Sequence, residues 1–113
     1  MEFQRAVQLT GDSDIYQISD RIKEYTLIDL GFERTKRGNY RYLGSLDRQS
    51  PFKPFARLQI TVNDDLTGFK MSTVSTNGLS NVNIFTQARR DEFVTQLHFI
   101  LNEMVERGIF DKK

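Results

Sequence analysis

Cysteine is absent from this chain of 113 residues, and histidine occurs once, at His98. The missing thiols exclude disulfides, thiolate zinc sites and cysteine nucleophiles together. One imidazole cannot supply the histidine pair or triad of a zinc centre, so we predict no metal site. His98 could act as a general base, but it lies beside the apolar face of a predicted helix, where packed or surface histidines are commoner.

Long apolar runs and glycine-rich phosphate loops are also missing. No segment approaches the roughly 18 to 20 apolar residues that span a bilayer. The first ten residues, MEFQRAVQLT, lack the basic stretch and apolar run of an export signal. No GxGxxG, GxxxxGK[ST] or GxSxG pattern can be read, which argues against a standard nucleotide enzyme. We therefore expect a cytoplasmic protein that uses no cofactor and contacts no membrane.

A strong excess of one charge is missing as well, because the formal net charge is +1. Residues 32–57 nevertheless hold seven bases and two acids, against nine bases and thirteen acids elsewhere. Four aromatic residues are interleaved with these bases, namely Tyr40, Tyr42, Phe52 and Phe55. Such a segment could bind nucleic acid, with bases on phosphates and rings stacked on nucleobases. The alternative is a solvated hairpin whose rings face the core.

What the sequence does contain is a change of hydrophobic period near Phe85. Apolar residues alternate before it, at Leu58, Ile60 and Val62, at Phe69 and Met71, and at Val82 and Ile84. After it they recur every three or four residues, at Phe93, Val94, Leu97, Ile100, Leu101 and Met104. Alternation is typical of strands and the longer spacing of one helix face. The chain is therefore predicted to be one α+β domain over residues 1–113, with mainly antiparallel strands and one long C-terminal helix.

The predicted helix covers residues 87–107. Asp91 and Glu92 lie in its early turns and Gly108 follows it as a C-terminal cap. Phe99 lies opposite the apolar stripe, so we expect it to be exposed or covered by another segment. Strands are predicted over residues 3–9, 55–63, 69–76 and 81–85.

Residues 19–32 carry two conflicting patterns. Ser19 and Gly31 suit the ends of a helix, whereas Thr26, Ile28, Leu30 and Phe32 alternate as in a strand. We favour a short helical turn over 20–24 that runs into a strand. The next segment, 36–39, contains Gly38 and Asn39 and is predicted to be a hairpin turn.

Asparagine is rare in strands, yet Asn81 and Asn83 share one face of the predicted strand 81–85. Two neighbouring amides could bind a polar ligand, although an edge strand or turn whose polar face meets water is the commoner explanation. With Asp47, Arg48 and Asn77 they form our set of candidate ligand-binding residues. No catalytic residue is predicted.

Three segments together carry a family resemblance: GNYRYLGSLDRQSP, NDDLTGFKMS and TNGLSNVNIF. In this order, and followed by a C-terminal helix, they resemble a small uncharacterised family of lactic-acid bacteria. The resemblance implies an α+β fold in which two sheets pack against a single main helix. It also implies a strand over residues 25–32.

The same family is remotely similar in fold to bacterial S-adenosylmethionine decarboxylases, which implies a role in amino-acid metabolism. Those enzymes cleave a Glu-Ser bond and use cysteine and histidine, whereas this chain has no Glu-Ser dipeptide and no cysteine. The expected function is therefore a non-enzymatic binding or accessory protein in amino-acid or sulfur metabolism, with a small molecule or protein partner. The alternatives are a nucleic-acid-binding module that uses residues 32–57 and an enzyme that uses His98.

Overall fold

The protein is built mainly of two antiparallel sheets and one long helix. The computed structural model describes residues 3–50, 52–78 and 80–113. The first sheet has the order β1-β2-β7, with β1 (Ala6–Val7), β2 (Tyr16–Ile18) and β7 (Phe110–Lys112). The second has the order β3-β4-β5-β6, with β3 (Glu33–Arg34), β4 (Tyr40–Ser45), β5 (Arg57–Val62) and β6 (Phe69–Val74). These two sheets confirm the predicted α+β class.

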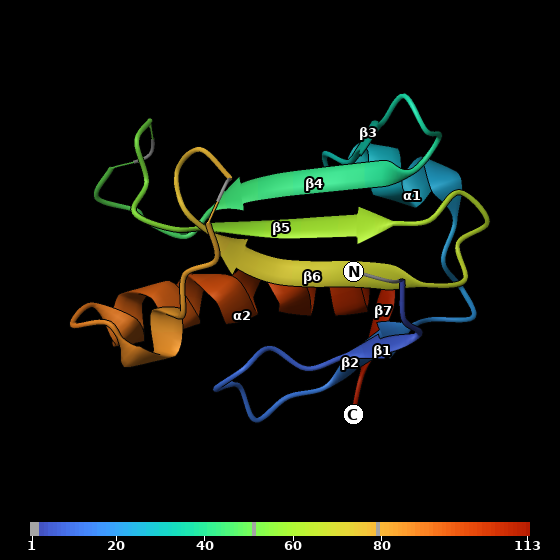
Figure 1. Ribbon diagram of the computed structural model, residues 1–113. Coiled ribbons are helices and arrows are strands. Elements are labelled where there is room, and N and C mark those ends of the chain that lie inside the picture. The colour runs from blue at the N-terminus through green and yellow to red at the C-terminus, as the bar shows by residue number, and fades with distance from the viewer. Residues whose placement is uncertain (1–2, 51, 79) are drawn as a thin grey trace.

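The long helix α2 (Arg90–Glu106) lies along one face of the four-stranded sheet (Figure 1). Its buried side chains are Phe93, Leu97, Leu101 and Met104, and Phe99 on the opposite side is 65% exposed. α2 begins three residues later than predicted, because a 3₁₀ helix η1 (Ile84–Thr86) and an extended Gln87 precede it. No helix within the described residues is long and apolar enough to cross a membrane.

Gly108 ends α2 as predicted. With φ at +80° it lets its own N–H bond the Val105 carbonyl at 3.1 Å, while the Ile109 N–H bonds the Met104 carbonyl at 2.9 Å. This is the Schellman pattern, in which a left-handed residue satisfies the last helical carbonyls. The turn sends the chain directly into β7, which pairs with β2 from the N-terminal part of the chain.

The predicted strand over residues 25–32 is wrong, because a helix α1 (Glu24–Asp29) occupies most of it. Thr26 and Leu27 are both buried, whereas Ile28 is 47% exposed, so burial does not alternate there. Gly31, with φ at +101°, ends α1, and the Phe32 N–H bonds the Leu27 carbonyl at 3.0 Å. The chain therefore turns once at Gly31 before β3 begins.

The predicted strand over residues 81–85 is also replaced by other structure. Asn81 forms only an isolated bridge with Val74, and Asn83 caps η1 by accepting a hydrogen bond from the Phe85 N–H at 2.9 Å. Asparagine favours such caps because its short side chain can accept from the backbone. The other predicted elements agree better with the structure. The hairpin turn at 36–39 joins β3 to β4. The predicted strands over 3–9, 55–63 and 69–76 contain β1, β5 and β6.

One buried ion pair fixes the start of α2 to the loop between β4 and β5. The Asp47 side chain is 3% exposed, and its carboxylate accepts from the N–H groups of Gln49 at 3.1 Å and Phe55 at 3.0 Å. The Arg89 guanidinium binds both carboxylate oxygens, at 2.6 and 3.3 Å. A carboxylate bound in this way by a fork of two N–H donors is held in a single orientation.

Aromatic packing surrounds this ion pair. The Arg89 guanidinium also binds the Glu92 carboxylate and lies 4.9 Å from the centre of the Phe93 ring. The rings of Phe93 and Phe55 are stacked, with centres 5.6 Å apart and an interplanar angle of 6°. Charge and ring contacts therefore hold Asp47 and Phe55, on the chain between β4 and β5, against the start of α2.

Burial of α2 generates the first prediction. Leu97 is fully buried, so Leu97→Ala should lower the free energy of unfolding by about 2 to 5 kcal/mol. Glu103 is exposed, so Glu103→Ala should change it by less than about 0.5 kcal/mol. Denaturant melts of both variants measure these differences, and equal small losses would show that α2 is peripheral.

The Asp47 ion pair generates a second prediction. The hydrogen bonds from Arg89, which outweigh burial, and from the Phe55 and Gln49 N–H groups lower the pKa of Asp47 from 3.8 to about 2. A carboxyl with a lower pKa when folded stabilises the protein above its unfolded pKa, and this stabilisation is lost as pH falls. Unfolding free energy should therefore drop between about pH 4 and pH 2, over the interval between these two values.

Asp47→Asn tests that assignment. It should lower stability by about 1.5 to 3 kcal/mol at neutral pH and flatten the acid limb of the stability curve. Asp111→Asn, which changes an exposed carboxylate on β7, is the matched control and should leave the acid limb unchanged. An unaltered acid limb in Asp47→Asn would show that another group controls it.

Candidate functional site

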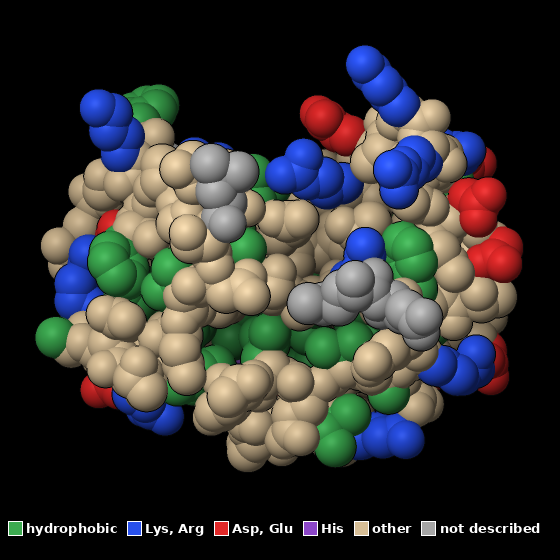
Figure 2. Space-filling model, in the orientation of Figure 1, with side chains coloured by type: hydrophobic (Ala, Val, Ile, Leu, Met, Phe, Trp, Pro, Cys, Tyr) green, Lys and Arg blue, Asp and Glu red, His purple; other side chains and the backbone are tan. Residues whose placement is uncertain are grey.

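The face of the four-stranded sheet turned away from α2 is open and polar. Side chains of β5 alternate, so Leu58, Ile60 and Val62 are buried against the core and Gln59 and Thr61 point outward. Within the described residues, no helix covers this outer face, which is turned toward the viewer in Figure 1. Figure 2 shows Lys and Arg side chains gathered over the β3–β4 part of it.

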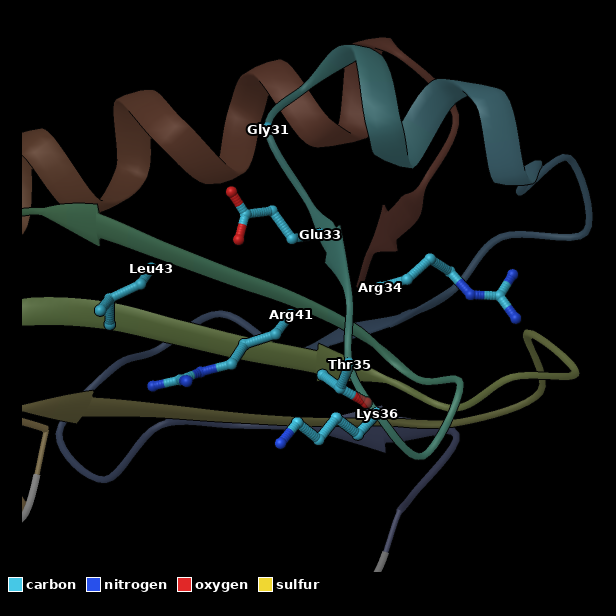
Figure 3. A pocket seen from close by; sticks show the side chains of 7 residues that line it. All are labelled: Gly31, Glu33, Arg34, Thr35, Lys36, Arg41 and Leu43. Carbon is cyan, nitrogen blue, oxygen red and sulfur yellow. The ribbon is translucent and has the colours of Figure 1, made fainter.

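A cavity of about 460 Å³ opens at the β3–β4 part of this face. We call it the β3–β4 groove; its lining residues are Gly31, Glu33, Arg34, Thr35, Lys36, Arg41 and Leu43. Glu33 and Arg41 are direct partners in the β3–β4 register and therefore lie on the same face. The Glu33, Lys36 and Arg41 side chains extend to one side of β3, and Arg34 extends to the other (Figure 3).

The charged groups of the β3–β4 groove differ in whether they have partners. Arg34 donates to Glu24 at 2.6 Å and to the Tyr40 hydroxyl at 2.5 Å, so its charge is already neutralised. Within the described part of the chain, the side chains of Glu33, Lys36 and Arg41 form no hydrogen bond or ion pair. One carboxylate and two cations are thus available to a ligand.

A hydrogen-bonded triad beside the groove holds α1 against the β3–β4 hairpin. The Tyr40 hydroxyl donates to the Glu24 carboxylate at 2.6 Å, and Arg34 binds both groups. The bond from Tyr40, together with Arg34, lowers the pKa of Glu24. Burial, followed by the bond to Glu24, raises the pKa of Tyr40. Both shifts favour an ionised Glu24 and a neutral Tyr40, which is the arrangement that fixes the wall of the groove.

A polar row continues from the groove across the sheet. Arg41 is opposite Thr61 in the β4–β5 register, and Thr61 is opposite Lys70 in the β5–β6 register. The Lys70 ammonium lies 4.5 Å from the centre of the Phe3 ring. The outer face therefore presents Glu33, Arg41, Thr61 and Lys70 in one row across four strands.

The five residues proposed from the sequence are not brought together. The Asp47 carboxylate is occupied by Arg89 and backbone groups, and Arg48 is exposed in the same loop. Asn77 accepts a hydrogen bond from the Ser75 hydroxyl in a turn at 2.8 Å. Asn81 and Asn83 share a cavity of about 220 Å³, although the side-chain Oδ1 atom of Asn83 already accepts from the Phe85 N–H and caps η1.

The aromatic residues of the basic segment mostly face away from the open surface. Tyr40 is 2% exposed, Tyr42 packs on Phe32 with ring centres 5.3 Å apart, and Phe55 stacks on Phe93. Phe52 is 91% exposed, and Phe55 is 47% exposed although it stacks on Phe93. Tyr40 and Tyr42, the two rings of β4, therefore cannot stack on nucleobases while the protein is folded.

A second group of reactive side chains lies on the three-stranded-sheet side of α2. Asp12 and Asp14 come from the loop between β1 and β2, and His98 comes from the middle of α2. The His98 Nε2 atom is 3.2 Å from Asp12 Oδ1 and 3.7 Å from Asp14 Oδ2. Counting histidines and cysteines along the sequence could not find this group, because two of its members are carboxylates and His98 is 86 positions from Asp12.

Comparison with known proteins places the chain in a family. A family model described as "DUF1831: Putative amino acid metabolism" matches residues 1–111. The crystal structure of a DUF1831 family protein, lp2179 of Lactobacillus plantarum, is similar with a TM-score of 0.91. It is 42% identical, over 100% of this chain and 99% of that one. No protein with a curated description matches. The extent of the family match and of this structural likeness shows that the chain belongs to the DUF1831 family.

Proposed function

We propose that this protein binds a small zwitterionic metabolite of the amino-acid class in the β3–β4 groove, without catalysing its conversion. The observation that carries this proposal is the set of unpaired charges at the groove, namely the Glu33 carboxylate, the Lys36 ammonium and the Arg41 guanidinium. An amino acid presents the complementary charges, an ammonium and a carboxylate, on one carbon atom.

Each group of the groove has a counterpart in such a ligand. A guanidinium matches a carboxylate with two parallel hydrogen bonds, which suits Arg41 to the ligand carboxylate. Glu33, opposite Arg41 in the sheet, is placed to accept from the ligand ammonium. Leu43 is 38% exposed and offers apolar surface to a side chain. The volume of about 460 Å³ lies within the range of about 300 to 1,000 Å³ found for small-molecule sites.

The family description supports the same chemical class, since it names putative amino-acid metabolism. A link to sulfur metabolism and to S-adenosylmethionine decarboxylases remains a prediction from the sequence resemblance. A nucleic-acid ligand is less well supported, because the rings of Tyr40 and Tyr42 are turned into the protein.

Isothermal titration with a panel of amino acids tests the proposal. Arg41→Gln should weaken the binding of the preferred amino acid at least tenfold, because about 1.4 kcal/mol of charge-assisted binding is lost. Arg37→Gln is the matched control, since Arg37 is exposed in the same hairpin but does not line the groove. Absence of binding at millimolar concentrations, or equal losses in the two variants, would contradict the proposal.

Glu33→Gln separates recognition of the ammonium from general attraction of anions. In the unaltered protein, the amino acid should bind more tightly than the corresponding acid without its amino group. Glu33→Gln should remove that preference while it leaves binding of the desamino acid unchanged. Tight binding of single-stranded RNA, with an affinity that falls steeply with salt, would instead favour the nucleic-acid alternative.

A further inference from the structure

We propose that Asp12, Asp14 and His98 bind one divalent transition-metal ion between the β1–β2 loop and α2. This site is separate from the β3–β4 groove and does not depend on the function proposed for it. One ligand atom from each of the three residues lies within 4.8 Å of the other two.

The two separations that involve His98 are close to those in metal sites. Ligand atoms about 2.0 to 2.2 Å from a metal are about 3.0 to 3.6 Å apart when they occupy neighbouring positions of an octahedron or tetrahedron. The Nε2 atom of His98 is 3.2 Å from Asp12 Oδ1 and 3.7 Å from Asp14 Oδ2, and all three ligand atoms lie within 4.8 Å of one another. Side-chain rotations would be needed to bring the three groups onto one ion.

A buried carboxylate oxygen of the cluster has no partner. The Asp12 side chain is 2% exposed, and its Oδ2 atom has no hydrogen-bond partner within the described residues. A buried carboxylate oxygen without a partner is unfavourable, and coordination to a metal ion would satisfy it. The fully buried Tyr16 hydroxyl also lacks a partner within the described residues.

The Tyr16 hydroxyl lies close to both carboxylates. Asp14 and Asp12 are its nearest acidic neighbours, and a phenol hydroxyl can donate a hydrogen bond to a coordinating carboxylate. Groups of this kind orient the metal ligands and are often needed for tight binding.

The donor set selects the class of ion. Carboxylates alone favour Mg²⁺ or Ca²⁺, whereas an imidazole together with carboxylates suits Mn²⁺, Fe²⁺ or Zn²⁺. Exposed fractions of 28% for Asp14 and 32% for His98 leave a route for the ion and room for bound water. We therefore expect a site that has three protein ligands and an open position, and that binds Mn²⁺ and Zn²⁺ in competition.

Binding at this position would tie distant parts of the chain together. The Asp12 N–H bonds the Leu9 carbonyl at 3.0 Å, and the Gln8 amide donates to the Asp12 carbonyl at 2.8 Å, so the loop is already ordered. A ligand that binds only the folded state raises its stability by mass action. Mn²⁺ should therefore raise the melting temperature of the metal-free protein.

Electron paramagnetic resonance of Mn²⁺ with the metal-free full chain tests the proposal. Protein should reduce the sharp signal of free Mn²⁺ with a stoichiometry of one ion per chain, and Zn²⁺ should restore it. His98→Gln and Asp14→Asn should each weaken binding at least tenfold. Asp111→Asn, an exposed carboxylate on β7, is the matched control and should bind Mn²⁺ as the unaltered protein does.

Circular dichroism of each variant shows whether it is folded, and the partial exposure of Asp14 and His98 favours folding of both variants. Mn²⁺ binding that is unchanged in His98→Gln and Asp14→Asn would overturn the proposal. Absence of binding of either ion at millimolar concentrations would also overturn it, and would indicate that the contact of His98 with Asp12 and Asp14 only holds the loop against α2.

Discussion

Burial of the apolar face of α2 is the constraint on which the rest of this structure depends. Phe93, Leu97, Leu101 and Met104 are each at most 2% exposed, and they join one continuous core with buried residues of both sheets. Buried residues of the three-stranded sheet, such as Tyr16 and Phe110, and of the four-stranded sheet, such as Leu58 and Ile60, belong to the same cluster as those of α2. The helix therefore contributes to one core that it shares with both sheets.

The same helix determines which face of the four-stranded sheet is covered (Figure 1). Because α2 covers one face of the four-stranded sheet, the other face stays open, and the polar row with Glu33 and Arg41 lies there. The ends and middle of α2 also carry functional groups, since Arg89 just before it holds the loop containing Asp47, and His98 meets Asp12. α2 therefore contributes buried side chains to the core and also positions Arg89 and His98 beside their acidic partners.

Features of the fold that depend on a short stretch of the chain could be predicted from the sequence. The helix spacing of α2, its end at Gly108 and the hairpin at Gly38 all follow from periodicity or from positive φ at glycine. α1 was missed because chance alternation at Thr26 and Ile28 imitates a strand, while tertiary packing decides the outcome. Asn83 was misassigned because an asparagine in a short apolar run can equally well cap a 3₁₀ helix.

The candidate sites depend on contacts that sequence spacing does not contain. The excess of basic residues over 32–57 singled out Lys36 and Arg41. It could not predict that Arg41 lies opposite Glu33 or that the Tyr40 side chain is buried. Asp12, Asp14 and His98 meet only because β7 returns to β2 after α2.

The central claim is that the open face of the four-stranded sheet is the ligand surface. Amide chemical-shift mapping of the full chain with its preferred amino acid tests this claim most directly. The account predicts changes centred on residues 33–36 and 41–43, whereas changes centred on Asn81 and Asn83, or none, would contradict it.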